Sequence, residues 1–161
     1  MTVEVLLQDP RWDEAGLTRV APAAGDAALE HLGLQPSEWD ITVLACDDAR
    51  IADLNATFRG KPQPTNVLSW PSVDRRAGEP GTHPTAPRGA DPELGDLALA
   101  FETCAAEADR AGITLAVHAT HLVVHGTLHL LGYDHESDGD AALMEQLEIE
   151  ILASLGIANP Y

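Results

Sequence analysis

Short apolar runs recur along the chain and are separated by residues that favour turns. Runs of four to eight hydrophobic or β-branched residues, bounded by proline, glycine or aspartate, are typical of β-strands. The pattern predicts strands at residues 3–7, 41–45, 66–70 and 97–101, and the run ITVLA at 41–45 has the composition of a buried strand.

Between these runs, apolar residues recur at the spacing of helices. Residues that start or end helices flank these segments, namely Asp47, Thr114 and Ser137 before them and Gly112, Gly132 and Gly156 after them. Helices are predicted at 47–58, 102–110, 115–131 and from Ser137 to Gly156, the last with an apolar stripe of Leu143, Leu147, Ile151 and Leu155. A segment at 12–33, which contains Pro22 and Gly25, is predicted to be a helix that is broken or begins late. The predicted fold is α+β, with helices packed on a small mixed β-sheet.

Residues 72–93 show neither the strand nor the helix period. The stretch 71–93 holds five of the eleven prolines and three of the thirteen glycines, so a long flexible loop is predicted at about 72–93. The chain has 161 residues, the size of one domain, and residues 1–161 are predicted to form a single domain.

The chain is strongly acidic. Twenty-six acidic against nine basic residues give a net charge of −17, which repels nucleic acid at long range. The basic residues are grouped, however, with Arg59 close to Lys61 in sequence and with Arg75, Arg76 and Arg88 in the predicted loop. This grouping is compatible with a local basic face on an acidic body.

The cellular compartment follows from what the sequence lacks. The first residues show no basic segment before an apolar stretch, and no apolar run approaches the roughly 18 residues of a membrane helix. Cys46 and Cys104 form no C-x-x-C pair, which indicates reduced thiols. We therefore expect a cytoplasmic protein without a signal peptide, membrane span or disulfide.

The candidate chemistry lies in HGTLHLLGYDH, residues 125–135. His125 and His129 would share one helix face, and a turn at Gly132 would bring His135 back to them. This is the spacing of the metzincin zinc peptidases, H-E-x-x-H-x-x-G-x-x-H, except that Gly126 replaces the glutamate that activates water. Three imidazoles with an open fourth position predict a catalytic centre on a metzincin-like metal-binding helix followed by a glycine turn. The donor set suits Zn²⁺, with nickel, copper or iron as alternatives.

Two features beside this motif allow more than one interpretation. Gly126 costs a helix about 0.8–1 kcal/mol relative to alanine, and it leaves room either for a closely packed segment or for a substrate beside the metal. His121 and His118 stand one and two turns before His125, too far away to bind the same ion easily. They are either pocket-lining or core residues.

Three stretches resemble the bacterial YbeY family of endoribonucleases and rRNA maturation factors. They are HLVVHGTLHLLGYDH at 121–135, LNATFRGKPQPTNVLSWP at 54–71 and LGDLALA at 94–100, and the ending LGIANPY is similar too. The resemblance covers about 54–161. The chain departs from the family at Pro62 and Gln63, where charged residues are common, and in the longer 72–93 loop.

The resemblance implies one zinc ion on His125, His129 and His135 and a functional arginine at Arg59. It also implies a single-strand-specific endoribonuclease that acts in 16S rRNA 3′-end maturation and in ribosome quality control. The expected partners are rRNA, the small ribosomal subunit and a ribosomal protein or rRNA-processing factor; no membrane and no DNA are expected.

Roles for the surrounding residues remain open. Arg59 would clamp the phosphate, or would pair with an acid such as Asp96. Asp134, Glu136 and His121 are nearby candidates for a general base. Asn66 and Trp70 would lie at the edge of the site, where an aromatic ring can stack on a base, although a core position for Trp70 is favoured.

Two other functions compete with this one. A metal-dependent hydrolase of peptides or small esters would lack its glutamate base at Gly126. A zinc-stabilised ribosome assembly factor without catalytic activity would use the metal for structure and would recruit a separate nuclease.

Overall fold

The computed structural model describes residues 2–161 and confirms the α+β class. The strands are β1 (Val3–Leu7), β2 (Asp40–Cys46), β3 (Val67–Pro71) and β4 (Glu93–Ala100). The helices are α1 (Arg11–Glu14), α2 (Leu17–His31), α3 (Asp48–Arg59), α4 (Phe101–Ala111), α5 (Leu115–Leu130) and α6 (Asp138–Ser154), and a 3₁₀ turn spans Pro36–Glu38. Among these helices none has the length and hydrophobicity needed to cross a membrane.

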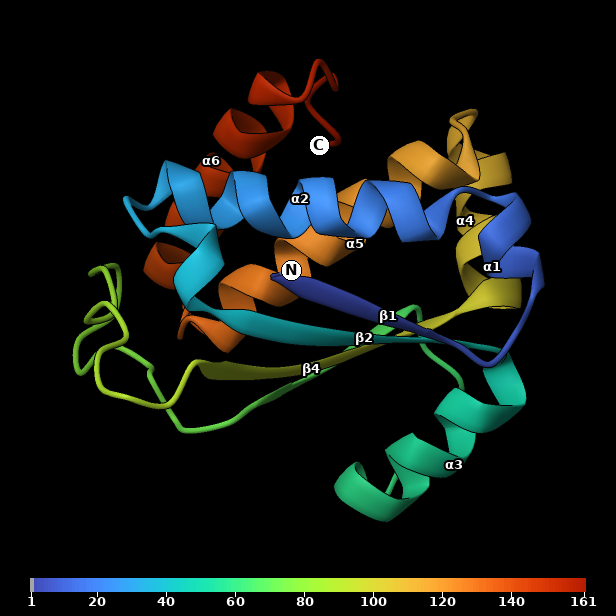
Figure 1. The fold of residues 1–161 in the computed structure, drawn as a ribbon, viewed down its shortest axis with the longest axis horizontal. Helices are drawn as coiled ribbons and strands as arrows, with labels where there is room; N and C mark the ends of the chain where they lie inside the picture. Colours follow the sequence, from blue (N-terminus) through green and yellow to red (C-terminus); the bar gives the residue numbers. More distant parts are fainter. Residues whose placement is uncertain (1) are drawn as a thin grey trace.

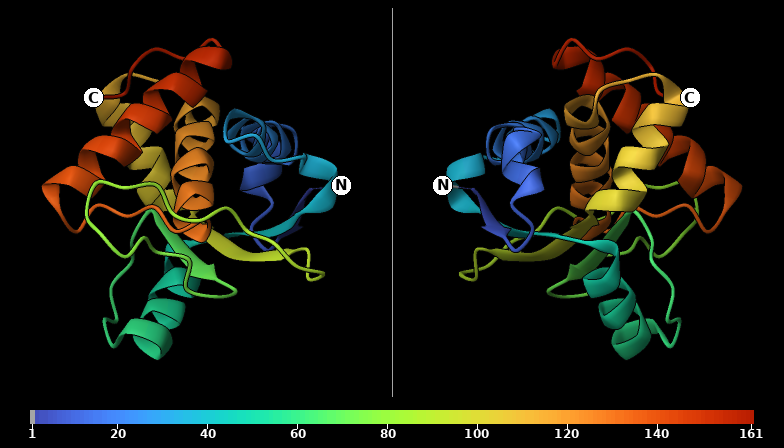
Figure 2. Two further views of the ribbon diagram at one scale, coloured as in Figure 1. Left: turned by 90° about the vertical axis from the view of Figure 1, so that its left-hand side faces the viewer. Right: turned by 90° about the vertical axis from the view of Figure 1, so that its right-hand side faces the viewer.

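Within residues 2–161 the strands form one mixed sheet in the order β1-β2-β4-β3. β1, β2 and β4 run parallel, and β3 pairs antiparallel with β4, with Ser69 opposite Leu97. β3 is therefore an edge strand. Helix α3 lies on one face of the sheet, and α1, α2, α4, α5 and α6 lie on the other (Figures 1 and 2).

Helix α5 is the centre of the main core. Its buried side chains point to several sides, among them Leu122, Val123, Val124, Leu128 and Leu130. A helix that is apolar around most of its circumference is covered on most sides by protein. Here α5 contacts α2, α4, α6 and the β3–β4 edge of the sheet, so the packing fixes both its position and its rotation.

The local start and stop signals act as the sequence predicts. Asp47, Thr114 and Ser137 each accept a hydrogen bond from a backbone N–H in the first turn of α3, α5 and α6. Gly112 and Gly156 both have positive φ after α4 and α6. These caps are short-range interactions, which is why the pattern of residues alone is enough to predict them.

The break in the 12–33 segment, the limits of β4 and the buried stripe of α6 differ from the predictions. The 12–33 segment breaks at Gly16, which has φ 84°, and not at Pro22, which lies inside α2. Strand β4 begins at Glu93, four residues before the predicted start, and Phe101 already belongs to α4. In α6 the buried positions are Met144, Leu147, Glu148, Ile151 and Leu152, so the stripe includes a carboxylate.

Gly126 packs α5 closely onto β4. A Cβ atom at this position would lie 2.7 Å from Cδ2 and 3.0 Å from Cδ1 of Leu97. Leu97 is fully buried, so its side chain has little freedom to move away. Of the two interpretations of Gly126, close packing of a neighbouring segment is the one that this geometry supports.

We expect Gly126→Ala to destabilise the fold by about 1–3 kcal/mol, because the added methyl group overpacks the core. In an open helix the same change would stabilise by about 1 kcal/mol. Urea unfolding of Gly126→Ala, Leu97→Val and the double variant measures the effect. The double variant should recover part of the loss; a stabilised Gly126→Ala protein would show that the close contact has no energetic weight.

Candidate metal centre

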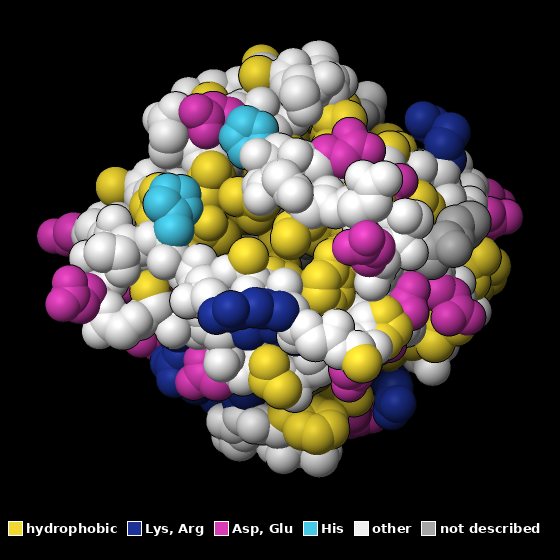
Figure 3. Space-filling view, turned by 60° about the vertical axis from the view of Figure 1, so that its left-hand side comes forward, with side chains coloured by type: hydrophobic (Ala, Val, Ile, Leu, Met, Phe, Trp, Pro, Cys, Tyr) yellow, Lys and Arg dark blue, Asp and Glu magenta, His cyan; other side chains and the backbone are white. Residues whose placement is uncertain are grey.

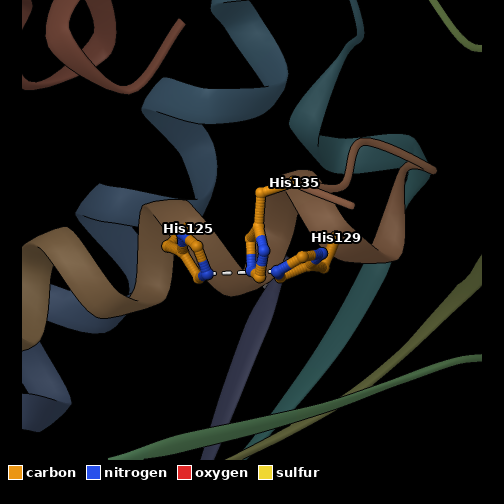
Figure 4. A group of neighbouring side chains, drawn as sticks. All are labelled: His125, His129 and His135. Carbon is orange, nitrogen blue, oxygen red and sulfur yellow. Dashed lines mark hydrogen bonds between the residues drawn. The ribbon is translucent and has the colours of Figure 1, made fainter. Parts of the chain in front are cut away.

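Three histidines converge at the end of α5. His125 and His129 lie one turn apart on the helix, and their Nε2 atoms are 3.0 Å apart. Gly132, with φ 104°, reverses the chain after the helix, and His135 then returns to the same point (Figure 4). One ligand nitrogen from each histidine lies within 4.8 Å of those of the other two. The structure thus brings together the three residues that the spacing predicts.

The geometry of this cluster fits a bound metal ion. Nitrogen atoms about 2.0–2.1 Å from a tetrahedral ion lie about 3.3–3.4 Å from one another, so the Nε2 atoms of His125 and His129 need to separate by only a few tenths of an ångström. Three imidazoles form a donor set for first-row transition metals. Because His135 is exposed, a fourth ligand has access from solvent.

Two hydrogen bonds orient the ligands from behind. His129 Nδ1 lies 2.9 Å from the backbone oxygen of Tyr133, and His125 Nδ1 lies 3.1 Å from Oε1 of Glu148. A carbonyl and a carboxylate only accept, so each imidazole donates from Nδ1 and keeps a lone pair on Nε2 for the metal. Burial, together with the neighbouring His125, lowers the pKa of His129 to about 4 and keeps its ring neutral.

Glu148 is a functional residue that the sequence analysis missed. Its side chain is 1% exposed, and it accepts hydrogen bonds from His121 Nε2 at 2.7 Å, from His125 Nδ1 at 3.1 Å and from the Tyr161 hydroxyl at 2.9 Å. Burial by itself raises the pKa of this carboxyl, but the hydrogen bonds from the two histidines outweigh that effect and lower the pKa to about 2. Its spacing was the available signal, because Glu148 lies four residues from both Met144 and Leu152 on an apolar stripe. Acids are rarely buried unless they are paired, so a carboxylate on such a stripe indicates hydrogen-bond partners.

Arg59 lies beside the metal ligands in an open pocket of about 470 Å³, hereafter the Arg59 pocket. Other lining residues include His129, His135, Asp134, Glu136 and Ser69. Arg59 is the last residue of α3 and is exposed, and no ion pair to it is present within residues 2–161. The alternative in which Arg59 pairs with Asp96 therefore has no contact to support it.

The 72–93 segment has no helix or strand, but it contacts the glycine turn. The Arg75 guanidinium donates to the backbone oxygens of Leu130 at 3.0 Å and Leu94 at 3.2 Å. A Cβ atom on Gly132 would collide with the Arg75 carbonyl, so both φ and space require glycine there. Arg76 pairs with Asp74 at 2.9 Å. Two of the three loop arginines thus have partners inside the protein, and Arg88 is exposed.

Asn66 and Trp70 were both candidates for the edge of the site, with a core position favoured for Trp70, and the structure agrees with the core position. The Trp70 side chain faces α3, packs against the small cluster around Leu68 and Ala98, and meets the Phe58 ring with centroids 5.6 Å apart. It does not line the Arg59 pocket, whereas its neighbours Ser69 and Pro71 do. This is the alternation of a β-strand, and it places Trp70 in the packing of the far face.

Asn66 lines a second pocket, of about 220 Å³, on the other side of His125. Glu107 is central to this cavity, hereafter the Glu107 pocket, and accepts hydrogen bonds from Asn66 Nδ2 at 3.1 Å and from His118 Nε2 at 2.9 Å. His121 lines the same pocket. His118 and His121 are therefore pocket-lining residues with carboxylate partners, and neither joins the three metal ligands.

Acidic side chains dominate the charge of the surface. On the face shown in Figure 3 they are scattered among neutral groups, and the basic side chains form no continuous band. With a net charge of −17, long-range attraction of RNA is unfavourable. Positive charge near the metal centre comes from Arg59, Arg75 and Arg76 in the Arg59 pocket.

The fold and the centre together define the class, an α+β protein with a three-histidine site of the type found in metal-dependent hydrolases. Comparison with known protein families then identifies one family within that class. The model of the family described as Endoribonuclease YbeY matches residues 6–156, and the chain belongs to this family. The match extends the resemblance from about residue 54 back to residue 6.

Relatives of high similarity carry the same description. The chain is 58% identical to the endoribonuclease YbeY of Dinoroseobacter shibae, over 99% of this chain and 90% of that protein. It is 55% identical to that of Jannaschia sp. over the full length of both proteins. These descriptions agree with the prediction of an enzyme that acts on RNA.

A solved structure shares the fold. The solution structure of TM1509 from Thermotoga maritima has a TM-score of 0.57 and covers 96% of this chain and 92% of that one, at 19% identity. At this identity the likeness concerns the fold alone.

We expect Glu148→Gln to weaken zinc binding about 10–100-fold, because an amide in this place orients the His125 ring less strongly than a carboxylate does. Calorimetric titration of the metal-free protein with zinc measures the loss. Glu145→Gln is the matched control, since it removes the same charge from an exposed position on α6. Equal affinity of both variants and the wild type would contradict the orienting role.

The depressed pKa of His129 predicts a pH effect on the metal-free protein. The pKa falls from 6.5 to about 4 on folding, so the unfolded chain binds this proton more readily than the folded one. The shift has no effect on the free energy of unfolding above about pH 6.5. It lowers this free energy progressively as the pH falls from 6.5 to about 4. The urea midpoint should fall across this window, and less steeply in His129→Gln; identical slopes would exclude His129 as a source.

Proposed function

We propose that the protein is a zinc-dependent endoribonuclease that cleaves single-stranded RNA at the His125–His129–His135 centre. The observation that carries the proposal is the shared Arg59 pocket, where a guanidinium without an acidic partner in residues 2–161 lies beside two of the three histidines. An electrophilic centre next to a free arginine suits a phosphodiester. The family description supports RNA as the substrate.

Arg59 has the chemistry that phosphoryl transfer requires. Its planar guanidinium donates two parallel hydrogen bonds to the free oxygens of a phosphate and stabilises the charge that develops on them. A zinc ion on the three histidines would act as a Lewis acid and supply water of lowered pKa. RNA also carries its own nucleophile, the 2′-hydroxyl group. The reaction therefore depends less on a protein carboxylate than peptide hydrolysis does.

The environment of Gly126 weakens the peptidase alternative. The glutamate of the peptidase motif would stand at this position, but the space beside the glycine is filled by Leu97 of β4. Asp134 and Glu136 line the Arg59 pocket, as does Asp74, which pairs with Arg76. His121 lies on the opposite side of His125, where its Nε2 is bound to Glu148.

The biological task that we propose is 16S rRNA 3′-end maturation and ribosome quality control in the cytoplasm. The strong negative charge makes independent capture of RNA unfavourable. A ribosomal protein or an rRNA-processing factor on the small subunit would supply the missing affinity. Recognition of the substrate then depends on where the partner holds the enzyme as well as on contacts at the metal centre.

The test is cleavage of a single-stranded RNA that spans the 3′ end of the 16S precursor. Zinc-loaded wild type should cleave it, chelation should stop the reaction, zinc should restore it, and His125→Ala should be inactive. Arg59→Ala should lower kcat/KM about 10²–10³-fold, with partial rescue by Arg59→Lys. Arg50→Ala, an exposed arginine of the same helix, is the matched control and should cleave normally.

Two outcomes would overturn the proposal. Equal activity of the wild type and His125→Ala, with zinc bound only to the former, would favour an assembly factor that recruits another nuclease. Turnover of peptides at a rate similar to that of RNA would favour the general hydrolase.

A further inference from the structure

The Glu107 pocket adjoins the metal centre on the side opposite Arg59. His125 lines this pocket and is also one of the three candidate metal ligands. A group bound in the pocket would therefore contact a residue of the metal centre. The pocket is not used by the proposed mechanism. Its contents show what kind of group it can hold.

The two pockets differ in charge. Three arginines and three acidic residues, Asp74, Asp134 and Glu136, line the Arg59 pocket, and Arg59 among them has no ion-pair partner within residues 2–161. No lysine or arginine lines the Glu107 pocket, which contains the Glu107 carboxylate. A phosphate therefore meets an arginine without an acidic partner only in the first pocket, and the Glu107 carboxylate repels it from the second. If the phosphate backbone of the RNA occupies the Arg59 side, the part that enters the Glu107 pocket is uncharged.

The polar groups of the Glu107 pocket offer both acceptors and donors. Glu107 Oε1 accepts from His118 Nε2 at 2.9 Å and from Asn66 Nδ2 at 3.1 Å, whereas Oε2 has only a long contact of 3.4 Å with Asn66. The Glu107 side chain is 28% exposed. Oε2 thus keeps capacity for a ligand N–H. The Asn66 amide beside it has two N–H groups and can turn one of them to a ligand, whereas the single Nε2–H of His118 is used by Oε1.

Apolar and aromatic surfaces complete the pocket. Val67 and Leu122 line it, and the Tyr161 ring lies at its edge, 5.7 Å from the His121 ring and nearly perpendicular to it. The Tyr161 hydroxyl donates to Glu148 at 2.9 Å, and the residue is 59% exposed. An accessible aromatic ring beside a polar pocket is a common arrangement for holding an unpaired base.

We propose that the Glu107 pocket binds an unpaired guanine base of a nucleotide adjacent to the scissile phosphate. The Watson–Crick edge of guanine presents two neighbouring N–H donors, N1 and N2, next to the O6 acceptor. Glu107 accepts from these donors through Oε2, and the Asn66 amide, which has two N–H groups, donates to O6. Adenine, cytosine and uracil each lack part of this pattern, so the pocket favours guanine. The inference rests on the proposed ribonuclease function and assigns it a base preference.

The first experiment compares cleavage of uridine-rich single-stranded oligonucleotides that carry one guanosine, inosine, adenosine or no purine. Wild type should cleave beside guanosine at least about tenfold faster than elsewhere, and inosine, which lacks the N2 amine, should be intermediate. Glu107→Gln should lose the preference while retaining the slower cleavage of the guanosine-free RNA. Asp109→Asn removes an exposed charge from the same helix and should keep the preference.

A binding measurement makes the inference independent of cleavage and of the folding of the variant. Zinc-loaded wild type is titrated with guanosine 5′-monophosphate and with adenosine 5′-monophosphate, and shifts of the NMR signals of Glu107-pocket residues are followed. Guanosine 5′-monophosphate should bind about tenfold more tightly. Equal affinities, or shifts confined to the Arg59 pocket, would overturn the guanine site. Cleavage of all RNAs without base preference would overturn it too while leaving the ribonuclease proposal intact, and guanine binding without any cleavage would overturn only the latter.

Discussion

The left-handed backbone of Gly132 is the constraint on which the metal centre depends, because it reverses the chain directly after α5 and returns His135 to His125 and His129. A side chain at this position would face two obstacles, the positive φ and the Arg75 carbonyl. The loop that contains Arg75 is in turn held by the carbonyls at the ends of α5 and β4. The turn, the loop and the ligands therefore form one connected unit.

The second support of the centre comes from the far end of the sequence. Glu148 of α6 joins His121 and His125 of α5 to Tyr161, and it does so in a nearly dry environment. A buried carboxylate is costly unless its lone pairs are used, and here three donors use them. The same group that ties α6 to α5 also orients a metal ligand, so stability and chemistry are coupled through one residue.

Sequence patterns were sufficient for features set by near neighbours. The strands, the helix caps and the three-histidine spacing all depend on residues within one or two turns, and the structure contains them. The start of β4 and the burial of Glu148 depend on pairing with β2 and on how α6 crosses α5, which local periodicity does not describe. The core position favoured for Trp70 is confirmed, but the face of β3 on which it packs follows from where α3 lies, which the sequence does not show.

The position of β3 at the sheet edge has a consequence for self-association. The edge of a sheet invites β-strands of other copies to add to it. Pro64 precedes β3 and Pro71 ends it, and proline has no N–H to continue a ladder. The strand is only five residues long. A short edge strand flanked by prolines offers few free N–H groups to a neighbouring copy, which limits the growth of the sheet by self-association.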